Sequence, residues 1–541
     1  MQAMKKSGPL PRWRALCLAS LALCSGAGWA QPGAEVAAEA PAEQAREVEV
    51  LEYIVRGNTV LDARSIERAV SPFLGPGRSL KDIEGARDAL LAVYQAKGYQ
   101  SVYVDLPEQQ VTEGLVLLQV NETRVGRVRV VGAAYQSPVE VREQVPALRE
   151  GAVPDFNQAQ VELTALNLGG KRQVMPLVRQ GALPGTMDVD LKVDDSSPWR
   201  ASVGLNNDRS ADTEDLRLTA SIGHDNLWQL GHSASMSIFA TPQDFNQTKV
   251  WSGSYSAPLR GTHWNLEASG YVSDSSVATV GGTNVIGKGY ALGMKAGYTV
   301  PDSGAWWHNF SAGVDLKNNK EALQFGKTSD EVPLKYAPIT LAYSGYYQGE
   351  KLQSGLGLSL VAGTRTFLGW GSDWQRFSYK RYKASPSFLV LKADFNGSYA
   401  LANESQLGWR FAGQLTDSPL VSGEQIAAGG TNSVRGYLSA EATGDVGMVG
   451  SIEWRTKPLS YFGERVEGWR AYLFADAGQL RLRDPLPEQQ HRFTLASVGL
   501  GTNFRIGPQI SARFDLAYPL KTGPRTERHD PRLTFNLNAS Y

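Results

Sequence analysis

The chain has 541 residues, a balanced charge of 54 basic and 54 acidic side chains, and a mean hydropathy of −0.28. That length predicts several domains, and the lack of a basic excess argues against nucleic acid as the main partner. After residue 30 no run of about 18 unbroken apolar residues occurs, so the sequence predicts no transmembrane helix. The abundant Gly, Trp and Tyr (56, 13 and 21 residues) favour many short strands with aromatic borders.

Residues 1–30 have the pattern of a secretory signal peptide. They hold basic residues near the start, an apolar core over 15–27, and a small-x-small motif that ends at Ala30. We therefore expect cleavage between Ala30 and Gln31 and export of the mature chain.

Both cysteines, Cys17 and Cys24, lie inside this signal, so the mature chain is expected to have no disulfide and no thiol chemistry. A lipoprotein cleavage at Cys24 is disfavoured, because Leu23 is large where such a site needs a small residue. Residues 31–48 are rich in Ala, Glu, Gln and Pro. They are expected to form either a flexible leader or a short helix that rests inside a pore as a plug.

Residues 49–123 are predicted to form a small α+β domain, because helical periodicity follows one strand and precedes two others. Ser79 is a candidate helix N-cap, with Asp82 three residues later as in a capping box, and Gly98 ends that helix. The expected elements are a strand over 50–60, helices over 62–73 and 79–98, and strands over 101–106 and 114–121.

Residues 124–196 repeat the same order of elements in a second domain. The expected elements are a strand over 125–131, helices over 138–148 and 156–168, and strands over 174–179 and 186–193. Two similar units in succession indicate a small array.

Residues 199–541 lose the helical period and alternate between apolar and polar side chains. About sixteen such segments begin near residues 199, 214, 232, 248, 264, 288, 307, 337, 352, 387, 406, 447, 469, 493, 509 and 532. Strands of about 9–11 residues in an even number are typical of membrane β-barrels. The predicted fold is therefore a membrane β-barrel of about 16 antiparallel strands, preceded by two small α+β domains. A soluble propeller or sandwich fits less well, because no blade-like repeat is present.

A long polar stretch, residues 416–446, separates two of these strands. Loops of this length are uncommon unless they have a function. Its centre reads Gly429-Gly430-Thr431-Asn432-Ser433-Val434-Arg435-Gly436-Tyr437. A barrel of about sixteen strands is wide enough to hold such a loop, so we expect it to fold inward.

A second motif, Phe474-Ala475-Asp476-Ala477-Gly478, lies in a later strand. The odd-numbered residues of this strand are apolar and are assigned to lipid, which turns Phe474 and Asp476 toward the lumen.

Arg435 is the candidate partner of Asp476, because a guanidinium can form a bidentate pair with a carboxylate. Gly436 would allow a tight turn, and Tyr437 offers a ring and a hydroxyl. Glu453, predicted to face inward on the preceding strand, is the alternative ion-pair partner. From spacing alone, a solvated loop arginine and an ordinary lumen aspartate remain the simpler interpretation.

Several motifs carry a resemblance to known families. Val55-Arg56-Gly57-Asn58, Gly98-Tyr99 and the stretch 184–190 make the two α+β units resemble POTRA domains, the periplasmic modules of outer-membrane transporters. Val434-Arg435-Gly436-Tyr437 followed by Phe474-x-Asp476-x-Gly478 resembles the signature pair of the POTRA-plus-barrel superfamily. That resemblance implies that the loop arginine docks on the strand aspartate.

Two POTRA-like units before such a barrel are similar to the transporters of two-partner secretion. The stretch 225–231 also fits that family, whereas Asn206-Asn207-Asp208 departs from its usual pattern. The resemblance implies an outer-membrane transporter that moves an unfolded partner polypeptide from periplasm to cell surface. The implied partners are a secreted protein, either a large β-helical adhesin or a haemolysin-like protein, and the outer-membrane lipid. The resemblance also implies that the POTRA domains bind the cargo and that folding of the cargo outside the cell drives its export.

An outer-membrane protein assembly factor of the same superfamily is the alternative, and a diffusion porin would lack the POTRA units. The sequence offers no enzymatic centre, cofactor site or metal site. Its six histidines are scattered without metal-ligand spacing, and Gly499-Leu500-Gly501 lies in a strand rather than before a helix.

Overall fold

The computed structural model describes residues 47–541 except 168–171, 276–278, 282–283, 287, 302–303, 321, 326–327, 332 and 461–464. These residues form two compact units. The first comprises the described residues up to Ala96 together with Val102–Glu122, and the second comprises Lys97–Ser101 and Thr123–Tyr541. The expected signal peptide, its cleavage site between Ala30 and Gln31, and residues 31–46 of the leader lie outside the described residues.

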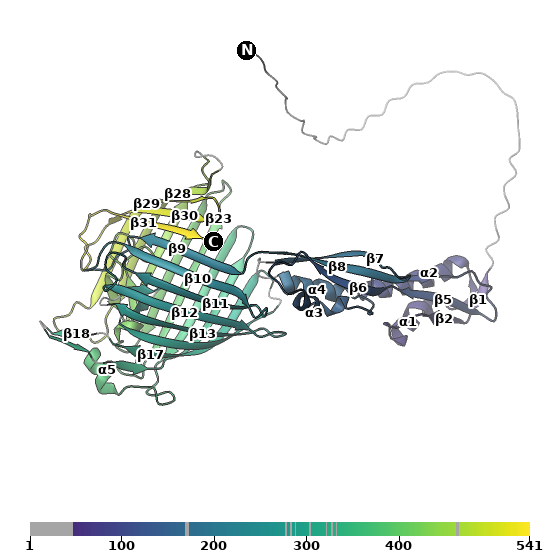
Figure 1. The fold of residues 1–541 in the computed structure, drawn as a ribbon, viewed down its shortest axis with the longest axis horizontal. Helices are drawn as coiled ribbons and strands as arrows, with labels where there is room; N and C mark the ends of the chain where they lie inside the picture. Colours follow the sequence, from purple (N-terminus) through teal and green to yellow (C-terminus); the bar gives the residue numbers. More distant parts are fainter. Residues whose placement is uncertain are drawn as a thin grey trace, which may run out of the picture. The chain divides into compact units, whose positions relative to one another are not determined.

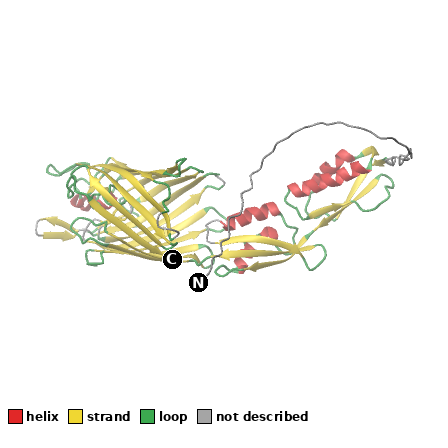
Figure 2. Ribbon diagram, turned by 90° about the horizontal axis from the view of Figure 1, so that it is seen from above, coloured by secondary structure: helices red, strands yellow, loops and turns green. Residues whose placement is uncertain are grey.

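The first unit has a three-stranded sheet covered by two helices (Figures 1 and 2). In sheet order β2-β5-β4, β2 pairs parallel with β5, and β4 pairs antiparallel with it. The second helix begins where predicted, since the Ser79 backbone N–H and hydroxyl both donate to Asp82. The elements are β1 (Val48–Val50), β2 (Glu52–Arg56), α1 (Ala63–Val70), η1 (Ser71–Phe73), β3 (Gly75–Arg78), α2 (Leu80–Ala96), β4 (Val102–Asp105) and β5 (Leu115–Glu122).

Two details of this unit differ from the sequence expectation. The single strand expected over 50–60 is two strands, β1 and β2, with Leu51 between them. Residues Gly75–Arg78 form β3 and pair with β1, where only a helix break was expected. Gly75 and Gly77 have φ angles of 118° and 69°, which favour glycine and shape this short strand.

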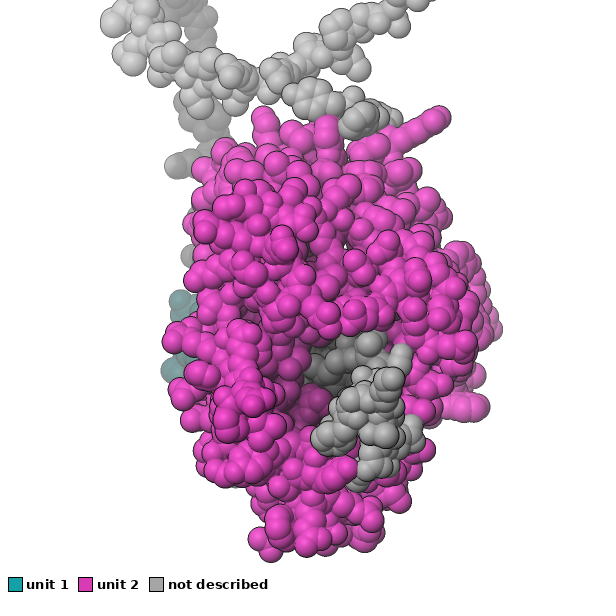
Figure 3. Space-filling model, turned by 90° about the vertical axis from the view of Figure 1, so that its left-hand side faces the viewer, with its two compact units in different colours: residues 1–96, 102–122 teal, residues 97–101, 123–541 magenta. Residues whose placement is uncertain are grey.

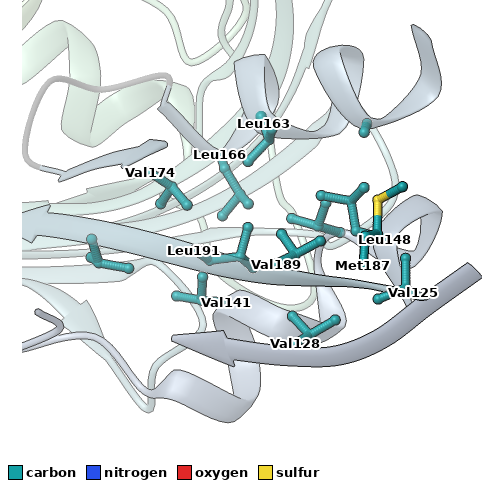
Figure 4. Close-up of a cluster of buried hydrophobic side chains, with 13 residues drawn as sticks. Val125, Val128, Val141, Leu148, Leu163, Leu166, Val174, Met187, Val189 and Leu191 are labelled. Atoms are coloured by element: carbon teal, nitrogen blue, oxygen red, sulfur yellow. The ribbon is translucent and has the colours of Figure 1, made fainter. Parts of the chain in front are cut away.

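The second unit begins with an α+β module of the same topology, in which β6 pairs parallel and β7 antiparallel with the central β8. Its core holds 13 buried apolar residues from the sheet and both helices (Figure 4). The helix expected over 138–148 is α3 followed by the short η2, because Pro146 cannot donate the backbone hydrogen bond that would continue α3. The elements are β6 (Arg124–Val131), α3 (Pro138–Glu143), η2 (Pro146–Leu148), α4 (Phe156–Asn167), β7 (Arg172–Gln180) and β8 (Thr186–Asp195).

Asp195, at the end of β8, fixes the loop that leads into α3. Partial burial raises the pKa of its carboxyl group, but hydrogen bonds from the backbone N–H groups of Ala134, Tyr135 and Gln136 outweigh this, and the pKa lies below its usual value. The same loop touches the turn between β10 (Arg217–Leu227) and β11 (His232–Ala240). There the Gln229 side chain accepts from Ser137 N (2.9 Å) and donates to the Tyr135 carbonyl (3.1 Å).

The rest of the second unit is a closed antiparallel barrel of 16 strands, as predicted, in which β20 and β21 both pair with β17 and count as one interrupted strand. Every predicted segment start lies within three residues of a strand start. The strands are β9 (Trp199–Asn206), β10 (Arg217–Leu227), β11 (His232–Ala240), β12 (Thr248–Pro258), β13 (Trp264–Ser275), β16 (Gly289–Thr299), β17 (Trp306–Asn319), β20 (Leu334–Tyr336), β21 (Ile339–Gln348), β22 (Leu352–Ala362), β23 (Leu389–Ala400), β24 (Gln406–Thr416), β27 (Val446–Arg455), β28 (Val466–Arg481), β29 (Arg492–Ile506), β30 (Ile510–Pro519) and β31 (Arg532–Ser540).

Side chains alternate between the outside and the lumen along the strands of the barrel wall, apart from irregularities in β10 and β28. On β28, Leu473 is 56% exposed on the outside, whereas Asp476 is 3% exposed on the lumen side. The outward residues of the last strand, Leu533 and Leu537, are likewise exposed and apolar. The barrel thus has an apolar outer surface and a polar lumen, as a membrane barrel requires. No helix in the described part of the chain is long and apolar enough to span a membrane.

The end of the barrel at which β9 finishes, here called the outer end, carries long loops with structure of their own. They contain two hairpins and a helix that alternation alone did not reveal: β14 (Thr279–Gly281) with β15 (Asn284–Ile286), β18 (Ala322–Phe325) with β19 (Thr328–Glu331), and α5 (Trp374–Lys380). Figure 1 shows α5 and β18 at this end, and Figure 3 shows it hollowed near its centre.

Candidate functional site

The residues between β24 and β27 form a loop, 417–445, that packs against the inner wall of the barrel. Two short strands, β25 (Ile426–Ala428) and β26 (Ala442–Gly444), pair with each other and let the chain return. Val434 and Tyr437 are buried with Leu480 of β28 and Leu495 of β29 in one apolar cluster. The loop therefore lies inward, with its tip against the wall made by β27–β30.

Arg435 lies at the centre of this contact and is fully buried. Its Nε is 2.6 Å from Asp476 Oδ2, and its Nη2 is 2.6 Å from Asp476 Oδ1. Its backbone N–H also donates to Asp476 Oδ2, at 3.0 Å. The guanidinium thus forms the bidentate pair that its planar shape favours, with a third bond from the main chain.

Glu453 does not compete with Asp476 but joins it. Arg435 Nη1 lies 2.6 Å from Glu453 Oε1, Nη2 donates to Ser451 Oγ at 2.9 Å, and the guanidinium carbon lies 3.5 Å from the centre of the Phe474 ring. The sequence posed the two carboxylates as alternatives, and the structure places both against the same guanidinium. Ser451 and Asp476 are direct cross-strand partners on β27 and β28, and Glu453 lies two residues after Ser451 on the same face. The two carboxylates are therefore close enough to contact one guanidinium.

A charge-balanced network surrounds the pair. Arg513 of β30 lies 2.8 Å from Asp515 and 3.3 Å from Glu453, and Arg455 lies 2.7 Å from Glu453. Three carboxylates, those of Glu453, Asp476 and Asp515, therefore meet three guanidinium groups. Because the site is buried, removal of one charge leaves an opposite charge without compensation, which is costly in a protein interior.

The remaining motif residues allow the close approach of loop and wall. Gly436 has φ of 90°, and a Cβ there would lie 3.1 Å from Ala517 Cβ. A Cβ on Gly478 would lie 3.1 Å from Val434 Cγ2. The Tyr437 hydroxyl lies 2.6 Å from the Lys521 carbonyl, in the loop after β30. Loop and wall are thus complementary in shape as well as in charge.

A second anchor at the base of the loop was missed from the sequence. Glu424 is buried, and its carboxylate lies 2.7 Å from Lys317 Nζ on β17 and 3.0 Å from the Tyr336 hydroxyl on β20. Gln414 donates both to the Glu424 carbonyl and to the Asp445 carbonyl at 3.0 Å, which joins the two ends of the loop. The loop is therefore held on two sides of the lumen.

A third contact ties the tip of the loop to the residues after β9. Asp208 accepts hydrogen bonds from the Thr431 backbone N–H (3.1 Å) and hydroxyl (2.7 Å). Asn207, its neighbour, donates to the Leu533 carbonyl and accepts from Phe535 N on the last strand. The stretch that departs from the family pattern thus contacts both the loop and the strand that closes the barrel.

Among the described residues, no group of three or more His, Cys, Asp or Glu side chains could hold a metal ion. The buried charged groups of the site pair with one another. These ion pairs join the 417–445 loop to the barrel wall.

Comparison with known proteins agrees with this architecture. The family model described as haemolysin secretion/activation protein ShlB/FhaC/HecB matches residues 185–504, and the ShlB-type POTRA domain matches 48–123. The chain is 22% identical over 496 residues to the outer membrane transporter CdiB of Escherichia coli, covering 87% of this chain and 79% of that protein. It is 22% identical over 435 residues to the CdiB of Dickeya dadantii (strain 3937), covering 75% of this chain and 72% of the relative.

Solved structures share the fold. CdiB from Escherichia coli superposes with a TM-score of 0.60 at 18% identity and covers 94% of this chain and 93% of that one. A BamA from Haemophilus ducreyi lacking POTRA domains 1–3 superposes with a TM-score of 0.55 at 15% identity, covering 92% and 100%. The family match spans more than half of the sequence. The chain therefore belongs to the haemolysin secretion/activation protein family, whose members are outer-membrane transporters of two-partner secretion.

Proposed function

We propose that the Arg435 network keeps the 417–445 loop inside the lumen and that an unfolded partner polypeptide passes through the barrel when the loop leaves this position. The observation that carries the proposal is the burial of Arg435 against Asp476 and Glu453, at 2.6 Å from each. A loop of this length is costly to order, at roughly 1–2 kcal/mol per fixed backbone residue, so a specific anchor is needed. An anchor made of ion pairs can also be exchanged for water when the loop moves.

We further propose that the partner is a large β-helical adhesin or haemolysin-like protein, recognised by two POTRA domains, 49–123 and 124–196. In the second module β7 is an edge strand that pairs only with β8 among the described residues. Its side chains Met175, Leu177 and Val178 are exposed. An exposed apolar edge favours the addition of an extended peptide as a further strand. The chain is proposed to act without catalysing a reaction or binding a cofactor, the folding of the cargo outside supplying the driving force.

Photo-crosslinking tests passage through the lumen. A photoreactive amino acid is placed either at Ser252 or at its neighbour Trp251 on β12. The Ser252 side chain faces inward, with its Oγ 2.7 Å from Ser237 Oγ, whereas Trp251 is exposed on the outside. The cargo carries a fast-folding C-terminal domain that stalls it in transit. We expect Ser252 to crosslink the stalled cargo and Trp251, the matched control, to give no product.

The assembly-factor alternative predicts a different pattern. If the cargo reaches the surface while neither position crosslinks it, or while Trp251 crosslinks it as strongly as Ser252, the polypeptide does not pass through the lumen. Either outcome contradicts the proposal.

A further inference from the structure

Two lysines and two aromatic rings form a cluster at the outer end of β16 and β17. Trp370 and Tyr290 lie with ring centres 6.4 Å apart in an edge-to-face arrangement. Lys335 Nζ lies 4.9 Å from the centre of the Trp370 ring, and Lys320 Nζ lies 5.9 Å from that of Tyr290. Each ammonium group is thus placed over an aromatic face, a geometry that favours cations.

The cluster sits at the border of the apolar band of the barrel. Tyr290 is the outermost residue on the lipid-facing side of β16, and the next two on that side, Leu292 and Met294, are exposed and apolar. Aromatic side chains concentrate at the interface between the hydrocarbon and the head groups of a membrane. The two ammonium groups therefore lie at the level of the outer-leaflet head groups.

A hairpin formed by residues 363–372 contributes Trp370 to the cluster. Phe367 and Trp370 pair across a two-residue turn of Leu368 and Gly369, whose φ angles are 50° and 80°. The Trp370 indole N–H donates to the Lys317 carbonyl at 3.1 Å, which fixes the hairpin to the top of β17. Leu368 is 93% exposed at the tip, so a large apolar side chain is held outside the protein.

Basic side chains outnumber acidic ones in the segment that carries Trp370. In the described part of the chain, neither Lys320 nor Lys335 forms an ion pair with a carboxylate. Residues 364–383 hold five basic side chains and one acidic side chain. Of the five, Arg381 pairs with Asp445 and Lys383 pairs with Asp484. The segment that carries the exposed Leu368 therefore has a net positive charge.

We propose that Lys320, Lys335, Tyr290 and Trp370 form a binding site for a phosphate group of the glycolipid in the outer leaflet, and that Leu368 inserts beside it. Phosphorylated glycolipid is the anionic component of that leaflet, and lysines next to a membrane surface each contribute roughly 1 kcal/mol toward anionic lipid. The cluster lies on the outer face of the wall rather than in the lumen, so a cargo chain in transit does not reach it. The site is independent of the function proposed above.

Lipid binding by the detergent-solubilised full chain tests the site. Bisphosphorylated lipid A is titrated by microscale thermophoresis against wild type, the double variant Lys320→Gln/Lys335→Gln, and the control Lys351→Gln/Lys457→Gln, which removes two exposed lysines from turns at the other end of the barrel. We expect the dissociation constant to rise about thirtyfold in the first variant, at roughly 1 kcal/mol per lysine, and to stay within about twofold of wild type in the control. Heat-modifiable gel mobility verifies that each barrel is folded.

Two further probes separate phosphate from apolar contact. Phosphate-free lipid A is expected to bind wild type as weakly as bisphosphorylated lipid A binds the lysine variant. The substitution Leu368→Asn, which suits the positive φ angle, is expected to weaken the binding of both lipids. Equal binding of the two lipids to wild type would overturn the phosphate site. Equal losses in the lysine variant and the control would do the same, and full displacement of lipid A by inorganic phosphate would show a site for the free anion instead.

Discussion

Deletion of residues 50–195 is expected to abolish secretion of the partner and to leave an inserted barrel. The strands β9–β31 close on one another without any strand of the α+β modules, so the barrel does not need them to complete its ladder. The deletion removes the exposed edge of β7, the surface proposed to receive the cargo. Cargo in the medium measures secretion, and heat-modifiable mobility in outer-membrane fractions measures insertion.

A narrower variant separates docking from gross damage. Leu177→Asp places a charge on the exposed edge strand without touching the module core, since Leu177 is 51% exposed. It is expected to reduce secretion, and Gln173→Asp, a polar residue of the same strand, is the matched control. Normal secretion after the full deletion would exclude the modules as the cargo dock.

Arg435→Ala is expected to impair secretion and to alter the conductance of the pore, with the barrel still inserted. Breaking a buried ion pair by removing one partner costs about 3–5 kcal/mol, and a wet lumen lowers this figure. Even about 1.4 kcal/mol shifts a loop equilibrium tenfold. Arg435→Lys is expected to rescue little, because lysine cannot bridge Asp476 in the bidentate manner and reach Glu453 as well.

A double-mutant cycle resolves the two carboxylates. Arg435→Ala and Asp476→Ala should be strongly non-additive, because both remove the same contact. Coupling to Glu453→Gln should be weaker, since Glu453 also pairs with Arg455 and Arg513. Arg505→Ala is the control, because Arg505 of β29 is exposed and its guanidinium lies 3.8 Å from the carboxylate of Glu467. An absence of coupling to either carboxylate would leave Arg435 without the anchoring role.

Alternation along the strands made the barrel predictable, because a wall with lipid on one side and water on the other imposes a period of two on every segment. The candidate cap at Ser79 likewise marked the start of the second helix of the first module. The outer loops could not be predicted this way. The hairpin β18–β19 and helix α5 lie in loops outside the barrel wall, so the wall does not impose its period on their sequences.

The contacts of the site could be predicted where the residues belong to short sequence motifs. They could not be predicted where residues far apart in the sequence come together. Arg435 and Asp476 stand in short motifs on either side of one strand. Glu424 and Lys317 are 107 residues apart, and Asp208 and Thr431 are 223 apart, and nothing in the local sequence pairs either residue with its partner. Only closure of the barrel brings such residues together, so pairing of this kind follows from topology rather than from local sequence.

The central claim is that the loop must leave its lumen position for the cargo to pass, and a disulfide lock tests it most directly. A Cβ on Gly478 would lie 3.5 Å from Ala428 Cβ, within the range that a disulfide needs. Both native cysteines precede residue 31, so the pair Ala428→Cys/Gly478→Cys is the only thiol pair in the expected mature chain. Gly478→Cys alone and the reduced double variant are the controls for the substitutions themselves. We predict that the oxidised double variant stops secretion and that a reductant restores it; normal secretion by the oxidised, quantitatively crosslinked protein would contradict the account.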